Sequence, residues 1–145
     1  MSAIDIFGLL VPVTYLVMLG IEAAFPARQL PPIPYWRLKG FCFLTVQCLL
    51  ATLSPLVIPE HWLAAHRLMN LESLGVIGGA ALGYAVVSLA SYAWHRSAHT
   101  FPLMWRLFHQ IHHSPQRVDM SGAALFHPLE TVAFLLIGTL VTTLV

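Results

Sequence analysis

Charged side chains are scarce in this sequence of 145 residues, where Lys, Arg, Asp and Glu together make up only 9%. A typical soluble domain carries about 25% charged residues. Hydrophobic residues make up 58% and the mean hydropathy is +0.77, so too few charges are present to cover a water-soluble fold. The formal net charge of +1 also excludes the basic surface of a nucleic-acid-binding protein. The composition therefore predicts an integral membrane protein.

Cysteine is nearly absent, since Cys42 and Cys48 are the only two and both lie in an apolar run. They can form neither a disulfide framework nor a C-x-x-C metal motif. A cleavable signal peptide is not expected either, because Asp5 stands where a basic segment should be and no A-x-A site follows.

Four uncharged stretches divide the chain, at residues 6–21, 40–59, 73–94 and 131–145. Crossing a bilayer takes about 20 apolar residues, and lipid forces such a stretch to be helical. The second and third stretches are long enough by themselves, and the first is long enough if Asp5 and Glu22 lie at the two interfaces. We therefore expect a single all-α membrane domain over residues 1–145 with about four transmembrane helices.

The fourth stretch is short, since Leu129 to Val145 would span about 25 Å at 1.5 Å per residue. One interpretation is a short helix with local thinning of the bilayer. We favour the other, in which these residues are the N-terminal part of a longer protein, because a terminal carboxylate within the bilayer is costly.

Lys and Arg predict the orientation of the helices. The first and third connections are rich in these residues, which are Arg28, Arg37 and Lys39, and Arg96, Arg106 and Arg117. The second connection carries only Arg67. By the positive-inside rule the first and third connections are cytoplasmic and the N-terminus is outside, as in a bacterial inner-membrane protein.

Glycines recur at the start of the third stretch, where Gly75, Gly79 and Gly83 stand at i, i+4 and i+8. This spacing predicts a face of minimal side chains that another helix can approach closely. The alternative is a membrane helix that is merely rich in small residues.

Histidine is concentrated in one region, because six of the eight lie between residues 95 and 127. His95 and His99 are four apart, and His109, His112 and His113 stand at i, i+3 and i+4, so each group is expected on one helical face. Two short cytoplasmic helical pieces, placed between the third and fourth membrane helices, can thus direct five imidazoles to a common point. Imidazole suits zinc, copper, iron and nickel.

Other histidine sites are less consistent with this pattern. No cysteine accompanies the clusters, which argues against a structural zinc finger. The H-E-x-x-H motif is absent from the sequence, which argues against a zincin protease. A bis-histidine haem site is disfavoured because residues 73–94 contain no histidine. His61 and His66 fall on the outer side and are interpreted as surface residues.

The stretch from Tyr92 to Thr131 reads YAWHRSAH, then LMWRLFHQIHHS, then MSGAALFHPLET. It resembles the membrane-bound sterol desaturase and fatty acid hydroxylase superfamily, especially bacterial members, which carry H-x3-H, H-x2-H-H and a later third histidine box. The first two boxes match at residues 95–113, and the HPLE phrase matches at residues 127–130. The third box is missing from this sequence.

The resemblance implies a di-iron centre that uses dioxygen and two electrons to hydroxylate or desaturate a sterol or fatty acyl lipid. By position it makes metal ligands of six histidines, namely His95, His99, His109, His112, His113 and His127. It also implies a lipid substrate and an electron donor such as a ferredoxin, a cytochrome b5-like protein or a reductase.

Several interpretations stay open at this stage. His127 can be structural instead, with Pro128 in the first turn of the fourth helix and Glu130 near its N-terminus. Asp119 and Glu130 are the carboxylates that could orient the imidazole ligands. The rival functions are a truncated or degenerate non-catalytic membrane paralogue and a membrane protein with a single metal ion, such as zinc.

Overall fold

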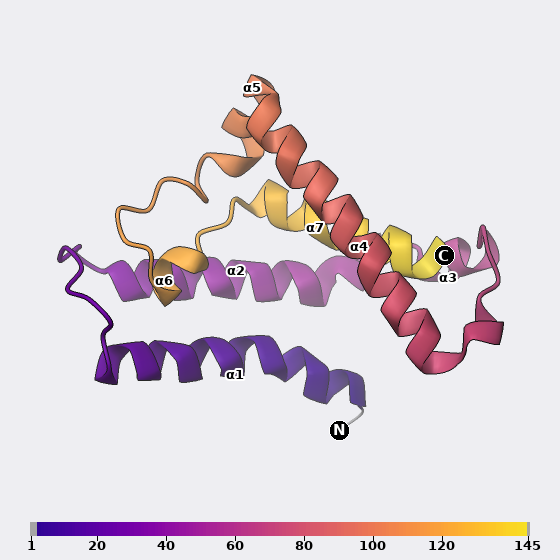
Figure 1. Cartoon of the computed structure of the whole chain (residues 1–145), viewed down its shortest axis with the longest axis horizontal. Coiled ribbons are helices and arrows are strands. Elements are labelled where there is room, and N and C mark those ends of the chain that lie inside the picture. The colour runs from indigo at the N-terminus through magenta and orange to yellow at the C-terminus, as the bar shows by residue number, and fades with distance from the viewer. Residues whose placement is uncertain (1–2, 145) are drawn as a thin grey trace. The chain divides into compact units, whose positions relative to one another are not determined.

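The computed structural model describes the backbone of residues 3–144 and the side chains of residues 8–59 and 61–143, and no strand occurs in that part (Figure 1). The helices are α1 (Ala3–Ala24), α2 (Trp36–Val57), α3 (Glu60–Ala65), η1 (Glu72–Leu74), α4 (Gly75–Thr100), α5 (Pro102–Met104), η2 (Trp105–His109), α6 (Met120–Ala123) and α7 (Pro128–Leu144). The all-α prediction is confirmed, while the proposed interfacial role of Asp5 lies outside the described side chains.

Two segments of the described chain are long and apolar enough to cross a membrane. They are α2 and the continuous stretch Glu72–Thr100, which joins η1 to α4 and has 29 residues. The apolar stretches Gly8–Ala24, which lies within α1, and Pro128–Thr143, which lies within α7, are shorter than 18 residues over the part of the chain whose side chains are described. That part of the chain therefore contains two candidate spans, fewer than the four expected.

The chain forms two compact units. The first contains the residues up to Cys48 together with Ile111–Phe126, and the second contains Leu49–Gln110 together with the residues from His127 onwards. The prediction of a single membrane domain over residues 1–145 stays a prediction. Each unit has its own packing and its own polar contacts, and the fold is described unit by unit below.

In the first unit, α1 runs antiparallel to the beginning of α2 (Figure 1), and α6 packs on α1. The buried centre consists of Tyr15, Leu44 and Ala124. Gly40 makes this packing possible, because a Cβ there would lie 2.7 Å from Oη of Tyr15 and 2.8 Å from Cα of Ser121. A close helix approach is therefore made at a glycine of α2 that the sequence pattern did not single out.

Asp119 ties the segment before α6 to the beginning of α2. Its carboxylate accepts from Nε1 of Trp36 at 2.8 and 2.9 Å, from Nε of Arg117 at 2.8 Å, and from the amide of Gly122 at 2.8 Å. Burial by itself would raise the pKa of Asp119, but the bonds from Gly122, Trp36 and Arg117, with the charge of Arg117, outweigh it and lower the pKa. Asp119 is therefore a structural carboxylate and the N-cap of α6.

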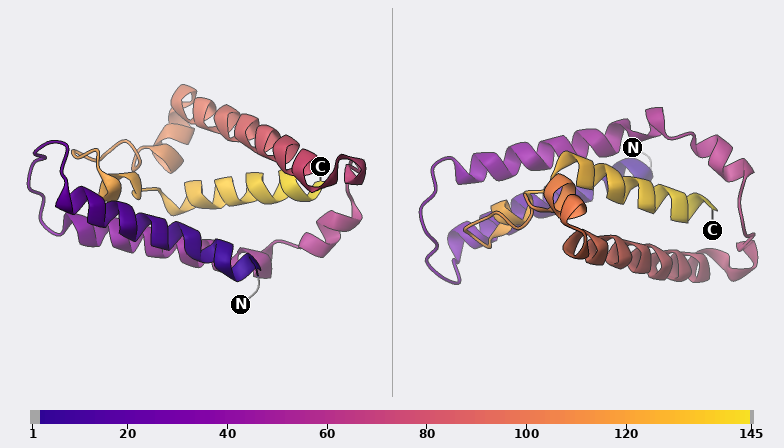
Figure 2. Two further views of the ribbon diagram at one scale, coloured as in Figure 1. Left: turned by 60° about the horizontal axis from the view of Figure 1, so that its bottom comes forward. Right: turned by 90° about the horizontal axis from the view of Figure 1, so that it is seen from above.

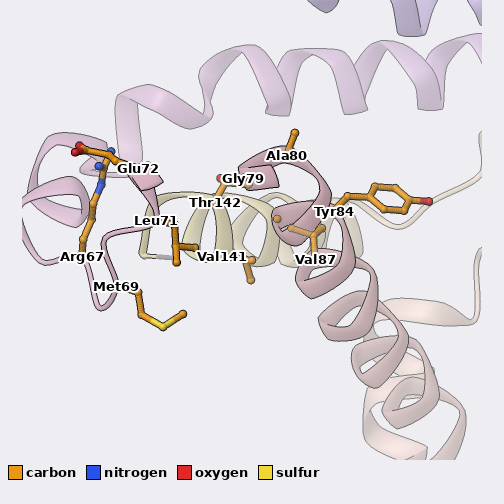
Figure 3. A pocket seen from close by; sticks show the side chains of 11 residues that line it. Arg67, Met69, Leu71, Glu72, Gly79, Ala80, Tyr84, Val87, Val141 and Thr142 are labelled. Carbon is orange, nitrogen blue, oxygen red and sulfur yellow. The ribbon is translucent and has the colours of Figure 1, made fainter. Parts of the chain in front are cut away.

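In the second unit, α4 packs against α7, and η2 contacts both helices (Figure 2). α4 begins at Gly75, whose φ of +62° is a conformation that favours glycine. At Gly79 and Gly83 an added Cβ would meet nothing within 4 Å, so the predicted close helix approach is not made at these two residues. They line a cavity of about 540 Å³ together with Tyr84 and Val141 instead (Figure 3).

Candidate metal centre

The last turns of α4 bring His95 and His99 together. The helix continues to Thr100, as the sequence predicted, so residues four apart lie on one face. The Nε2 atoms of the two rings are 3.2 Å apart, and their ring centroids are separated by 4.8 Å. This pair forms the first part of a histidine cluster in the second unit.

A π-helical turn adds His109 to this pair. After Pro102 starts a new helical turn, η2 follows with a wide i to i+5 bond, in which the amide of Gln110 donates to the carbonyl of Trp105 at 2.8 Å. π-helical turns are rare and frequent at functional sites. The turn sets Nε2 of His109 at 3.1 Å from Nε2 of His99, with the His109 ring centroid 4.5 Å from that of His95.

The helix does not continue through the second histidine box. Beyond Gln110 the chain forms a turn, in which the amide of Ser114 donates to the carbonyl of Ile111 at 3.1 Å. The expectation that His109, His112 and His113 share one face of a helix is therefore wrong. Only His109 lies on the helical turn itself.

Glu130 holds His109 from the other side. It lies in the first turn of α7, which begins at Pro128 as the sequence predicted. Its Oε1 is 2.5 Å from Nδ1 of His109, and both side chains are fully buried. A proton on Nδ1 that is donated to this carboxylate leaves the lone pair of Nε2 directed at the other two imidazoles. Glu130 thus does what was expected of an orienting carboxylate, whereas Asp119 serves the first unit.

Aromatic side chains surround part of the cluster. The ring of Trp105 lies 5.4 Å from that of His99 and 5.8 Å from that of His109. Trp94 makes an edge contact with Phe108 at 5.2 Å, which fixes η2 against α4. In the sequence, Trp105 belongs to the stretch that carries the family resemblance, four residues before His109. That position was the available signal for this contact.

Three further histidines were predicted as site residues, namely His112, His113 and His127. His112 and His113 belong to the first unit, where their ring centroids are 5.2 Å apart and His112 packs against Phe126 at 4.3 Å. In the second unit, Nδ1 of His127 accepts from the amide of Leu129 at 3.2 Å, a capping contact at the beginning of α7. The ligand roles of these three residues stay predictions.

His61 and His66, interpreted as surface residues, are both exposed. The ring of His66 stacks on that of Trp62, with ring centroids 4.0 Å apart, and its Nδ1 lies 2.8 Å from the Trp62 carbonyl oxygen. Neither histidine belongs to the group whose ligand atoms converge.

The donor set of the second unit fits a divalent transition metal. One ligand atom from each of His95, His99 and His109 lies within 4.8 Å of the others, so a single ion can contact all three. Neutral imidazoles are ligands that iron, zinc and copper accept, and a carboxylate on the far nitrogen of one of them is the usual outer partner. His99 is exposed and His95 is half-buried, so the cluster is accessible on one side and closed at His109.

Comparison with known proteins supports this interpretation. No curated protein and no solved structure matches the chain. The family described as fatty acid hydroxylase matches residues 80–145, a segment that contains both histidine boxes and α7. That family belongs to the sterol desaturase and fatty acid hydroxylase superfamily and implies an oxidoreductase that acts on lipids. The resemblance is confirmed over residues 80–145, which match the fatty acid hydroxylase family.

Proposed function

We propose that this chain forms part of a membrane-embedded non-haem iron oxidoreductase that hydroxylates or desaturates a sterol or fatty acyl lipid. The observation that carries the proposal is the convergence of Nε2 from His95, His99 and His109, with Glu130 on the far side of His109. The family match over the same residues supports a redox role for this centre instead of a purely structural one.

In the proposed centre, different residues of the second unit provide the metal ligands, orient one of them and pack beside them. His95 and His99 present two imidazoles from successive turns of one helix, and η2 supplies the third. Glu130 fixes the tautomer and the rotation of His109, so this ligand needs no reorganisation when a metal binds. Trp105 packs beside two of the rings and restricts water on that side. Bound iron would supply a site for dioxygen and pass on the two electrons that attack on an unactivated C–H bond requires, and a separate donor would deliver these electrons.

A di-iron centre needs more ligands than these three imidazoles. The resemblance carries His112, His113 and His127 over as further ligands, and we include them in the proposal. A simpler rival stays open, because three imidazoles suffice for one ion, as in many zinc sites. The number of metal ions per chain separates the two.

The bilayer is the expected environment of this chemistry. The α4 side chains of Val76, Ile77 and Leu89 are 90%, 87% and 67% exposed, which suits contact with lipid tails better than contact with water. We further propose that the histidine boxes face the cytoplasm of a bacterial inner membrane. A ferredoxin, a cytochrome b5-like protein or a reductase could deliver electrons there.

Metal analysis of the chain, purified in detergent from iron-supplemented cells, tests the centre. We expect iron to bind, at two ions per chain for the di-iron form and one for the rival. His99→Ala should lower metal affinity by at least roughly 10–100-fold, the range for loss of an outer partner alone. His61→Ala, at an exposed histidine away from the cluster, is the matched control. A His99→Ala protein that retains the metal of its parent would overturn the metal centre.

Isotope labelling tests the reaction. Membranes that contain the iron-loaded chain, a reductant and ¹⁸O-labelled dioxygen should yield lipid that carries one ¹⁸O atom if the reaction is hydroxylation. Desaturation should give lipid that has lost two hydrogens and gained no label. Absence of both products in membranes whose protein holds its full complement of iron would contradict the enzymatic role while leaving the metal centre intact.

A further inference from the structure

A polar hollow of about 550 Å³ lies in the first unit, and no residue of the metal centre of the second unit lines it. It is formed by the end of α1, the connector of residues 25–35, the first turn of α2 and residues 117–121. Five charged side chains line it, namely Glu22, Arg28, Arg37, Arg117 and Asp119. Neither the family match nor the proposed reaction assigns it a role.

Hydrogen bonds occupy both acids of this hollow. Asp119 accepts from Trp36, Arg117 and Gly122, and Oε2 of Glu22 accepts from the amide of Met120 at 3.0 Å. Arg117 is also engaged, because its Nη1 donates to the carbonyl of Pro31 at 3.1 Å.

Arg28 and Arg37 are the cations that remain. Both are exposed, and neither makes a hydrogen bond or an ion pair with any residue that the structure describes. The charged groups of this hollow that can still bind a ligand are therefore the two guanidinium groups, and both are positive.

Arg37 lines two neighbouring hollows of the first unit. A second hollow of about 420 Å³ lies beside the first, and Arg37 and Arg117 line both. A guanidinium presents a planar fork of donors that matches phosphate oxygens two at a time. A group that enters either hollow would therefore meet Arg37.

Exposed apolar side chains lie next to these cations. Ile21 and Phe25, at and just after the end of α1, are 50% and 79% exposed, and Val118 is 79% exposed. Such a combination of cations and apolar surface at the end of an apolar helix suits an amphiphile whose charged group reaches the hollow.

We propose that this hollow binds a phosphate ester, with Arg28 and Arg37 as its ligands and a phospholipid headgroup as its source. Free phosphate shares the same chemistry and is the second possible source. Arg117 is a positioning residue here, because its bonds to Asp119 and to Pro31 hold the connector in place.

Lipid binding to the full chain in detergent, measured by native mass spectrometry, tests the site. The probes are phosphatidic acid, diacylglycerol with the same acyl chains, and inorganic phosphate as a competitor. We expect phosphatidic acid to bind and diacylglycerol to bind at least tenfold more weakly. Arg37→Gln and Arg28→Gln should each weaken phosphatidic acid binding by roughly tenfold or more, as expected for loss of a charge-assisted hydrogen bond.

Lys39→Gln is the matched control, because it removes the same charge two residues from Arg37 at an exposed position that lines neither hollow. It should change binding less than twofold. Competition by inorganic phosphate at equal strength would support the site and assign it to free phosphate. Equal binding of phosphatidic acid and diacylglycerol, or equal effects of Arg37→Gln and Lys39→Gln, would overturn the proposal. So would an acidic peptide that binds through Arg37 when phosphatidic acid does not.

Discussion

Glu130 is the residue on which the arrangement of the metal centre depends most directly. Its carboxylate is fully buried and lies 2.5 Å from Nδ1 of His109. A buried carboxylate is costly unless it is paired, and here the pairing also determines which nitrogen of His109 is presented to a metal. Glu130 therefore acts through His109 and is a positioning residue.

Glu130→Gln should lower metal affinity by roughly 10–100-fold, the usual cost of losing an outer partner. Cobalt(II) titration of the detergent-solubilised chain, followed by its visible absorption, measures both the affinity and the geometry of the site. Glu72→Gln, an exposed glutamate of the same unit, serves as control. Unchanged cobalt affinity and spectrum in Glu130→Gln, with helicity retained, would show that Glu130 only helps α7 to pack.

The sequence identified Glu130 as a candidate for orienting an imidazole, but it could not distinguish Glu130 from Asp119 in this role. Asp119 and Glu130 are both acids close to the histidine boxes, and both were candidates for the same role. Asp119 instead receives bonds from Trp36 and Gly122, partners far from it and near it in the sequence. Nothing in local spacing distinguishes a carboxylate that caps a short helix from one that orients an imidazole.

At the scale of the helices, the apolar runs of the sequence predicted where the long helices lie. Some of these helices continue beyond the apolar run into polar residues. α4 continues six residues past the uncharged stretch that ended at Trp94, because its last turns carry the histidines on a helix that still packs in the second unit. The π-helical turn at Trp105–His109 could not be predicted. Its wide bond depends on the fit of η2 against α4 and α7, and the residue pattern of an α-helix differs little from it.

Gly40 offers a prediction about helix packing. Gly40→Ala would bring a Cβ within 2.8 Å of the backbone of Ser121, so α2 and the α6 segment must move apart. We expect a loss of about 1–3 kcal/mol in the free energy of unfolding in detergent, the usual cost of overpacking.

Gly79→Ala is the matched control for this prediction, because its Cβ would meet nothing within 4 Å. It should be neutral or stabilise by up to about 1 kcal/mol, since alanine favours a helix more than glycine does. Equal losses in the two variants would show that the contact at Gly40 is not tight in the protein.

At the scale of the whole molecule, composition predicted an integral membrane protein with about four helical spans, and the structure confirms the all-α fold over the part of the chain that it describes. Each of the four uncharged stretches lies largely in a helix, and two candidate spans, α2 and the Glu72–Thr100 stretch, are found over the part of the chain whose side chains are described.

The orientation of these helices can be tested by cysteine labelling. With Cys42 and Cys48 replaced by serine, a cysteine at the exposed Leu68 should react with a membrane-impermeant maleimide on intact cells. A cysteine at the exposed Leu103, beside the second histidine box, should react only after lysis, because the positive-inside rule places it in the cytoplasm. Labelling of position 103 on intact cells would reverse the orientation.

The local spacing of the three imidazoles has a consequence for how the protein assembles. His95, His99 and His109 come from one continuous segment, whereas Glu130 arrives with α7 at a later point in the chain. Contacts between neighbouring segments form faster than distant ones, and synthesis proceeds from the N-terminus. The imidazoles can thus meet while α7 is still being made, and the carboxylate of Glu130 then pairs with His109 once α7 has formed.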